Sequence, residues 1–534
     1  MGSRVIRKNF IRLGTKEENF ILTRSRVLLT LLCLVTFFAP EFSIAANAAS
    51  DAPISVACIT TAPHLDVITE DGQIVSLLLF ALESLVTTEE DGQGGIRIVP
   101  CLAESWKISE DGLSYTFNLK KGVKFHDGTP VTTEDWIWSI LRLRDAGPES
   151  PWSYLAHAVK EVAAPDEDTL VISLSEPYAP FLSNLTNPAL SVQSKKHFEK
   201  VGAEAFRDSP MGTGPYYFAE WELNQRYILK KNPYYHVEGK PVASEFRFIV
   251  VPDDNTRIMQ LQAGQVDVVR DLPQNRIDEL ASYPGLAVDA EPSTEQRFVN
   301  FNVTFPPLDD VRVRNALRLA TDKQAIIKMV LSGHGSPVFG VFPRVDTFCN
   351  KKLKDPGYDV EKAKALLKDA GQEKGFKLEI IYSSGNSVME NIATVLKEQW
   401  AKVGVDLQLV PLEGPTVSAT FQNLKHQVTM LRWSTDTADP VGFTSFIADY
   451  DASHGFHTGW KNERVTQLAH AAEKELDVEK RRGMYEEIQQ ILFDECPMYP
   501  LYENVYPVAR KDTVHNFKFS GLSRYVFIDA YKDE

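Results

Sequence analysis

The spacing of hydrophobic residues along the chain changes repeatedly between the period of a strand and that of a helix. Leu113–Lys120 places an apolar side chain at every second position, which predicts a strand with one face in water. Ile74–Leu85 repeats its apolar residues every three to four positions, which predicts a helix. Ile54–Cys58 and Thr169–Ser175 are short apolar runs and are expected to be strands. This alternation of element types indicates α/β lobes.

Polar segments with glycine and proline separate these elements. Thr132, with Asp135 three residues later, is typical of the start of a helix. The segment 210–217 holds two glycines and two prolines, which predicts a tight backbone path. A strand that ends at Trp221 follows, and Tyr227–Leu229 is expected to pair with it as a hairpin.

The second half of the chain contains the pattern of a parallel sheet. Phe376–Tyr382 is a predicted strand, Val388–Val403 an amphipathic helix, and Val405–Val410 a second strand. A strand, a helix and a strand in this order form the unit of a parallel sheet. The same reasoning predicts a helix over Asp359–Ala370 that ends at Gly371, a helix over Val478–Phe493 and a strand over Met498–Tyr502.

The first fifty residues have a different character. Arg24 and Arg26 precede an apolar stretch, Val27–Ala39, which is too short for a membrane span. An A-x-A site that ends at Ala48 follows it. A basic region, an apolar core and such a site predict a secretory signal peptide over residues 1–48, with a retained N-terminal anchor as the alternative.

Composition and charge narrow the class of protein. The chain has 534 residues, which is enough for more than one domain, and its 43% hydrophobic and 24% charged residues are ordinary for a globular protein. The net charge of −15 argues against nucleic acid as the main partner. After the predicted signal peptide four cysteines remain, without a C-x-x-C pair, and disulfides and buried free thiols both stay open. They are Cys58, Cys101, Cys349 and Cys496.

Motifs of catalysis and metal binding are missing from the sequence. It has no nucleophile elbow, no phosphate-binding loop and no H-E-x-x-H motif. His454 and His457 form an isolated H-x-x-H, for which a surface loop is the favoured interpretation. His126 stands beside Asp127, which is expected to cap a turn. These observations favour a binding protein over an enzyme, with no cofactor and no metal.

Several spaced blocks resemble the dipeptide, oligopeptide and nickel class of extracytoplasmic solute-binding proteins, the capture components of ABC importers. The blocks occur in the order found in that family and extend over nearly the whole mature chain. They are LAESW at 102–106, SEDGLSYTF at 109–117, KGVKFHDGTPV at 121–131, GTGPY at 212–216, KNPxY at 231–235, LxAGxxD at 261–267 and PLxDxRVRxAL at 307–317.

The resemblance implies an α/β, two-lobed periplasmic-binding-protein fold. An additional subdomain is inserted in the first lobe, and hinge closure covers a ligand site between the lobes. The expected parts are a signal peptide at 1–48, lobe I at 49–85, 190–297 and 505–534, the inserted subdomain at 86–189, and lobe II at 298–504.

The resemblance also points to ligand-binding residues. In peptide-binding members the block that matches Leu431–Pro440 carries a Trp and, three residues on, an Asp that pairs with the peptide α-ammonium. Here these are Trp433 and Asp436, whereas Asp439 is expected to be structural. A carboxylate in a partly dry cavity suits an ammonium, and an aromatic wall suits apolar side chains.

One departure from the family concerns the ligand carboxylate. Dipeptide-binding relatives carry an Arg at the end of the strand before the 388–403 helix, where this chain has Ser383 beside Tyr382. Arg432 and Arg344 are candidates to replace it, with an ordinary surface charge as the better interpretation of Arg344. His64 follows the first strand and is expected near the mouth of the cleft.

The expected function is capture of a peptide or peptide-like solute, as a monomer in the periplasm, and delivery to ABC-transporter permease subunits. A nickel chelate, haem or an opine-type ligand is the alternative within the family. A chemosensory, chaperone-like or hydrolytic role is the alternative outside it.

Overall fold

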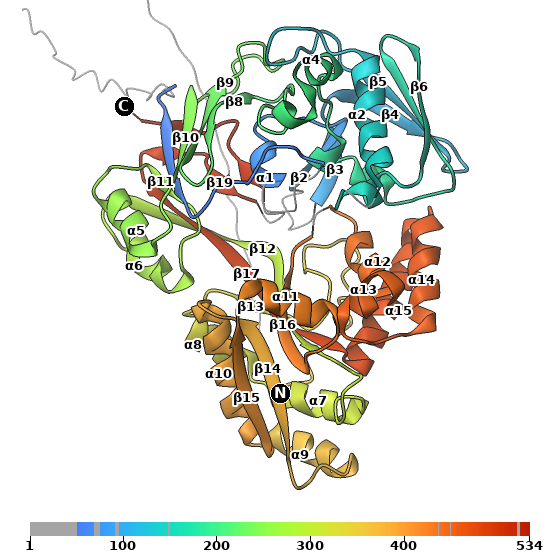
Figure 1. Ribbon diagram of the computed structural model, residues 1–534, viewed down its shortest axis with the longest axis vertical. Coiled ribbons are helices and arrows are strands. Elements are labelled where there is room, and N and C mark those ends of the chain that lie inside the picture. Colours follow the sequence, from blue (N-terminus) through green and yellow to red (C-terminus); the bar gives the residue numbers. More distant parts are fainter. Residues whose placement is uncertain are drawn as a thin grey trace, which may run out of the picture. The chain divides into compact units, whose positions relative to one another are not determined.

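A computed structural model describes residues 51–68, 75–90, 96–147, 150–435, 437–448, 450–520 and 524–533 (Figure 1). These residues belong to one compact unit that runs from Ala48 to Glu534. The predicted signal peptide and Asp436 lie outside the described residues.

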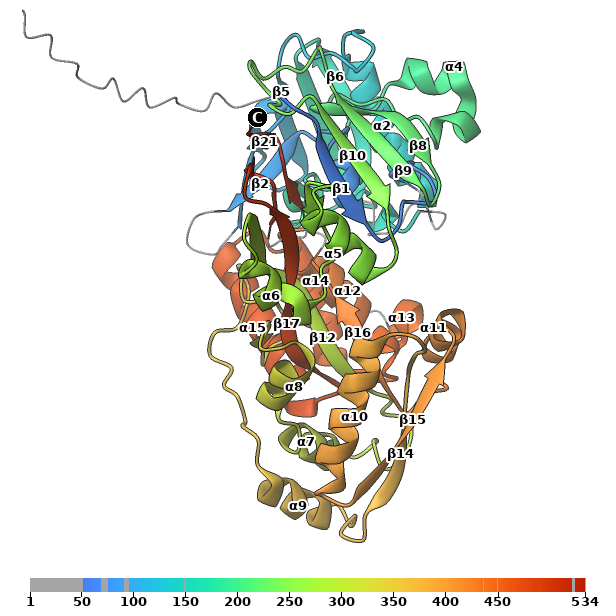
Figure 2. The ribbon, with the colours of Figure 1, turned by 90° about the vertical axis from the view of Figure 1, so that its left-hand side faces the viewer.

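One 11-stranded sheet runs through the described part of this unit. Two long antiparallel strands, β12 (Leu286–Phe301) and β17 (Met498–Lys511), lie side by side at its centre (Figure 2). The predicted strand Met498–Tyr502 was therefore too short, because residues 503–511 continue along β12. The predicted lobe II boundaries, 298 and 504, fall inside these two strands and stay predictions.

On one side of the long strands the sheet continues with β11, β1, β10, β9 and β8. The predicted hairpin is confirmed, because β8 pairs antiparallel with β9 and Trp221 lies opposite Tyr227. Strand β1 is parallel to both β10 and β11. The strands are β1 (Ile54–Cys58), β8 (Tyr216–Glu222), β9 (Arg226–Lys231), β10 (Glu245–Val250) and β11 (Val268–Val269).

On the other side lie β16 (Val428–Trp433), β14 (Phe376–Ser383) and β15 (Val405–Leu412), with α10 (Ser387–Ala401) packed against β14 and β15. Strands β14 and β15 are parallel, which confirms the predicted strand–helix–strand unit. The short strand β13 (Ser336–Pro337) pairs with β17.

A separate four-stranded antiparallel sheet has the order β4-β5-β7-β6 and packs with α2 (Thr133–Ala146). The predicted helix start is confirmed, because the side chains of Thr132 and Asp135 form a reciprocal capping box. The strands are β4 (Ala103–Ile108), β5 (Ser114–Leu119), β6 (Val159–Asp166) and β7 (Thr169–Leu174), preceded by the β2 (Val86–Glu90) and β3 (Ile96–Pro100) hairpin.

The predicted helix Ile74–Leu85 is wrong over most of its length, because α1 covers only Val75–Leu78. The chain leaves the helix to form tertiary hydrogen bonds: the Gly214 N–H donates to the Ala81 carbonyl at 3.0 Å, and the Tyr216 N–H donates to the Phe80 carbonyl at 2.8 Å. A Cβ at Gly214 would lie 2.5 Å from the Ala81 carbonyl carbon, so this close approach of two backbones requires glycine.

The remaining helices cover the sheets. The predicted helix after Asp359 is confirmed, with the Asp359 side chain accepting from the Lys362 N–H at 2.9 Å. The helices are α3 (Phe181–Asn184), α4 (Lys195–Phe206), α5 (Asp254–Gln262), α6 (Ile277–Ala281), α7 (Val311–Leu319), α8 (Lys323–Val330), α9 (Val360–Asp369), α11 (Gly414–Gln422), α12 (Val441–Ala448), α13 (Tyr450–His457), α14 (Glu463–Lys474) and α15 (Val478–Glu495), with 3-10 turns η2 (Ser153–Leu155), η3 (Pro188–Leu190) and η4 (Gln274–Arg276).

Candidate functional site

The carboxyl ends of three strands meet at one edge of the large sheet. Strands β15 and β16 both run parallel to β14, which places their ends beside Ser383 and Trp433. Ligands of open α/β sheets bind beyond the carboxyl ends of the strands. This edge is therefore the first place to look for a binding site.

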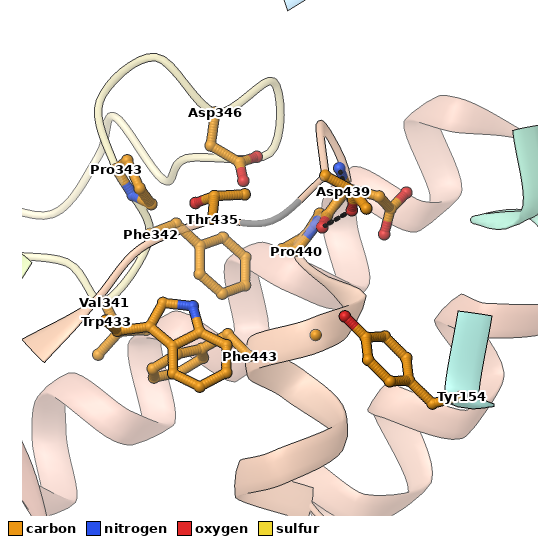
Figure 3. A pocket seen from close by; sticks show the side chains of 12 residues that line it. Tyr154, Val341, Phe342, Pro343, Asp346, Trp433, Thr435, Asp439, Pro440 and Phe443 are labelled. Carbon is orange, nitrogen blue, oxygen red and sulfur yellow. Dashed lines mark hydrogen bonds between the residues drawn. The ribbon is translucent and has the colours of Figure 1, made fainter. Parts of the chain in front are cut away.

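A pocket of about 320 Å³, including space open to solvent, lies next to this edge, and we call it the Trp433 pocket. Its described lining comes from three segments, which are the loop Val341–Asp346, the stretch from Trp433 to Phe443, and Tyr154 in η2. Figure 3 shows Tyr154 on the far side of the pocket from Trp433. Residues far apart in the sequence thus form one concave surface.

The Trp433 ring is held by other aromatic rings. Its centroid lies 5.7 Å from that of Phe443, 5.4 Å from Phe446 and 5.2 Å from Phe456, with steep interplanar angles of 82°, 66° and 89°. Edge-to-face contacts of this kind fix the orientation of a ring. The pocket therefore has a rigid aromatic wall, as the sequence predicted for Trp433, although its contact with a ligand stays a prediction.

Asp439 lines the pocket, and its carboxylate is fully engaged by protein groups. Its carboxylate pairs with the Arg481 guanidinium at 2.8 Å and accepts from the Val441 N–H at 3.1 Å. Both partners of the ion pair are buried, and the Arg481 Nε–H also donates to the Ala472 carbonyl at 2.8 Å. These contacts agree with the structural role expected for Asp439.

Asp346 is a second buried carboxyl group in the pocket lining. Its Oδ1 accepts from the Phe348 N–H at 2.7 Å. Burial raises the pKa of Asp346 to about 7, and the charge of Asp439 adds to the rise, while the Phe348 N–H, Arg481 and Arg482 oppose it. Sequence reasoning missed this residue, because nothing in the Pro343–Phe348 segment distinguishes it from an exposed loop aspartate.

Asp346 also faces a second hollow of about 230 Å³, which we call the Thr294 pocket. Its lining joins Thr294 of β12 and Ile96 of β3 with residues on either side of Asp346 and with Thr435, Thr437 and Ala438. Asp346 is thus shared by both pockets, with Thr435 and Thr437.

The two arginines that the sequence offered for a ligand carboxylate are both paired with acids. Arg432 directly precedes Trp433 in β16, and its guanidinium lies 3.5 Å from the Glu295 carboxylate. Arg344 binds Glu503 through its Nε–H at 2.6 Å and through its backbone N–H at 2.7 Å. Neither arginine belongs to the described lining of the two pockets.

The other predicted residues lie apart from the described pocket linings. Tyr382 is buried in the core between α10 and the sheet, and Ser383 ends β14 beside it. His64 lies in the segment after β1, where burial, followed by the charge of Arg207, lowers its pKa. The ligand roles of Tyr382, Ser383 and His64 stay predictions, as does that of Asp436.

Other chemistry considered from the sequence has a structural explanation. The Asp127 carboxylate accepts from the Thr129 N–H at 2.9 Å, which is the expected turn cap. The sequence left disulfides and buried free thiols as alternatives for the four described cysteines. All four are free thiols in the structure, which are Cys58, Cys101, Cys349 and Cys496. Within the described ranges no set of three or more His, Cys, Asp or Glu side chains is placed to hold a metal ion.

The four-stranded sheet domain contacts the helices beside the pocket. The Ala179 N–H donates to the Glu473 carbonyl at 2.7 Å, and Lys474 pairs with Glu176 at 2.5 Å. Val441 of α12 belongs to the same buried cluster as Leu155. These contacts join the part of the chain that contains the four-stranded sheet to α12 and α14. No described helix is long and apolar enough to cross a membrane.

A pocket between sequence-distant segments, on a sheet whose two central strands extend through both halves, defines a two-lobed ligand-binding protein. The family model described as bacterial extracellular solute-binding proteins, family 5 (middle region) matches residues 97–454. The chain belongs to this family.

Individual relatives support this assignment. The dipeptide-binding protein of Escherichia coli K12 is 31% identical over 472 residues, which cover 81% of this chain and 86% of the relative. Di/tripeptide-binding protein 1 of Pseudomonas aeruginosa is 28% identical over 469 residues and covers 82% of this chain and 87% of its own. The solved structure of the periplasmic binding protein DppA of Helicobacter pylori with the peptide STSA has a TM-score of 0.78 and 26% identity, and the match covers 91% and 99% of the two chains.

Proposed function

We propose that this protein captures a small peptide or peptide-like solute outside the cytoplasm and delivers it to the permease subunits of an ABC importer. The observation that carries the proposal is the Trp433 pocket, in which a fixed aromatic wall and a buried carboxyl group face the same hollow at the carboxyl edge of the sheet. The peptide-binding names of the relatives support the same ligand class.

The physical logic of capture follows from the pocket's lining. Apolar and aromatic side chains supply affinity by burial, while a few polar groups fix the orientation of the ligand. Because Tyr154 and the 433–443 stretch lie in different parts of the fold, a ligand that touches both favours the closed arrangement. Family membership and the predicted signal peptide support a location outside the cytoplasm, and a monomer is the proposed state.

Within this function Asp436 is the proposed anchor for the ligand ammonium, three residues after Trp433. Asp436→Asn keeps the shape of the side chain and removes its charge. We expect the loss of a charge-assisted hydrogen bond, about 1.5–3 kcal/mol, which weakens binding roughly ten- to a hundredfold.

The test has two steps. Native mass spectrometry of the purified protein identifies a retained ligand, and titration calorimetry then compares wild type, Asp436→Asn and Asp309→Asn, an exposed aspartate outside the pocket lining. Full affinity in Asp436→Asn would remove Asp436 from the site. Turnover of the peptide by the purified protein would overturn the transport function itself.

A further inference from the structure

Asp346 is a buried acid to which the proposed function assigns no group of the ligand. Only 8% of the residue is exposed, and it lines both the Trp433 pocket and the Thr294 pocket. Its one side-chain hydrogen bond among the described residues comes from the Phe348 N–H. No described Lys, Arg or His lies within ion-pair distance of its carboxyl group, although a buried carboxylate is costly without a positive partner.

The basic residues nearby are committed to other groups. Arg481 pairs with Asp439, Arg344 with Glu503, and Arg482 contacts Glu479 and the Thr347 carbonyl. Two of their contacts involve residues of the pocket linings, which are the Asp439 carboxylate and the Thr347 carbonyl, but neither is the Asp346 carboxyl group. The described part of the chain therefore supplies no counter-ion to Asp346.

The linings of the two pockets also contain more acidic than basic side chains. Their described residues include Asp346 and Asp439 but no Lys, Arg or His, and Asp439 is neutralised by Arg481. Among the described lining residues, a ligand that enters this space meets one acid without an ion-pair partner, Asp346, and no basic side chain. Electrostatic complementarity therefore favours a ligand with a positive group at this point.

We propose that Asp346 binds a cationic side chain of the ligand, so that the solutes captured here are peptides with a basic residue. This inference rests on the proposed function, and it assigns to Asp346 a group other than the N-terminal ammonium proposed for Asp436. Figure 3 shows the Asp346 carboxyl group above Thr435, on the opposite side of the pocket from Tyr154. A lysine ammonium or an arginine guanidinium supplies the missing partner.

The competing possibility is a protonated Asp346 that donates a hydrogen bond to a ligand carboxylate. The two differ in the sign of their pH dependence, given the groups that face Asp346, which are Asp439, Arg481, Arg482 and the Phe348 N–H. A cation binds the ionised carboxylate, so affinity rises as pH increases from 6 to 8 and protons are released. A carboxylate ligand needs the protonated acid, so its affinity falls over the same range and protons are taken up.

The experiment is titration calorimetry with alanyl-lysine and alanyl-norleucine, and with the same pair extended by one alanine. Norleucine has the length of lysine without its ammonium. Wild type is expected to prefer each lysyl peptide at least tenfold. Asp346→Asn is expected to lose this preference and to bind the norleucyl peptides within twofold of wild type. Asp355→Asn, an exposed aspartate further along the same segment, is the control and is expected to match wild type.

The outcomes separate the two proposals. If the norleucyl peptides bind as well as the lysyl peptides, or if Asp346→Asn keeps the preference, this inference is wrong and the peptide function stands. If neither kind of peptide binds wild type, the peptide function falls and the inference with it. Titrations of wild type with the lysyl peptide in two buffers of different ionisation enthalpy test proton release without any variant, and proton uptake would overturn the inference.

Discussion

Two walls of the same pocket each contain a buried aspartate, and the two aspartates differ in their ion-pair and hydrogen-bond partners. Asp439 is 6% exposed and has a complete set of partners, with the Arg481 guanidinium at 2.8 Å and the Val441 N–H at 3.1 Å. Asp346 is 8% exposed and accepts a hydrogen bond from a single N–H donor among the residues that the structure describes. The two side chains are almost equally buried, so they differ mainly in whether a positively charged side chain of the protein pairs with the carboxylate.

This difference separates a structural acid from a binding acid. A buried ion pair with satisfied hydrogen bonds holds elements in place, here α12 and α15. A buried acid without a counter-ion costs stability in the free protein, and such costs gather at functional sites because a ligand can relieve them. The wall around Asp439 is thus the frame of the pocket, and the loop around Asp346 is its recognition surface.

The largest expected effect comes from breaking the frame. Arg481→Met leaves Asp439 buried without its partner, and loss of one member of a buried pair costs about 3–5 kcal/mol. We expect a value near the upper end, since both side chains are almost fully buried. Urea unfolding measures it, with Arg482→Met, a more exposed neighbour, as the control. Equal losses in the two variants would contradict the structural role of the pair.

A second effect should appear on the other wall as a pH dependence. The folded-state pKa of Asp346 is about 7, above the value of 3.8 for the unfolded chain, so the folded state binds the extra proton between these values. Stability relative to Asp346→Asn therefore falls as pH rises from 4 to 7. Each pKa unit corresponds to about 1.4 kcal/mol, which gives up to about 4 kcal/mol.

Unfolding of wild type and Asp346→Asn at several pH values between 4 and 8 checks this expectation. The free energy of unfolding of the variant should increase relative to that of wild type as pH rises. This difference should become constant above pH 7. Asp439→Asn supplies the contrast, because it removes one member of a satisfied pair and is expected to be less stable than wild type at pH 7. Parallel curves for wild type and Asp346→Asn would mean that Asp346 is not buried as a charged group.

The sequence was sufficient for elements whose pattern is local. The β14–α10–β15 unit was predictable because its hydrophobic periodicity and its caps lie within each segment. The helix over Ile74–Leu85 was wrong because backbone groups of Phe80 and Ala81 bond to residues about 135 positions away, which no local pattern records. Tertiary hydrogen bonds overrode helical periodicity there.

The candidate site divides in the same way. Trp433 was found through a recognisable block, and it does line the pocket. Asp346 was missed because its burial depends on packing beside Thr435 and Pro343, two segments about 90 residues apart. The same limit applies to Glu83, which accepts hydrogen bonds from Thr213, Tyr235 and His236 although it belongs to no motif.

The smallest expected effect concerns Gly442, the second residue of α12, which lies between Trp433 and Tyr154. A Cβ there would lie 3.7 Å from Trp433 Cζ2 and 3.8 Å from the Tyr154 hydroxyl oxygen, both ordinary contact distances. Gly442→Ala is therefore expected to leave the fold intact and to raise stability by up to about 1 kcal/mol, because alanine favours the helix. The added methyl group occupies ligand space, so peptide affinity should fall severalfold.

Gly483→Ala, on the exposed face of α15 with no atom near its Cβ, is the matched control and should gain stability without losing affinity. Thermal unfolding and titration calorimetry with one peptide measure both quantities. If the two variants bind the peptide equally well, the ligand does not occupy the space between Trp433 and Tyr154.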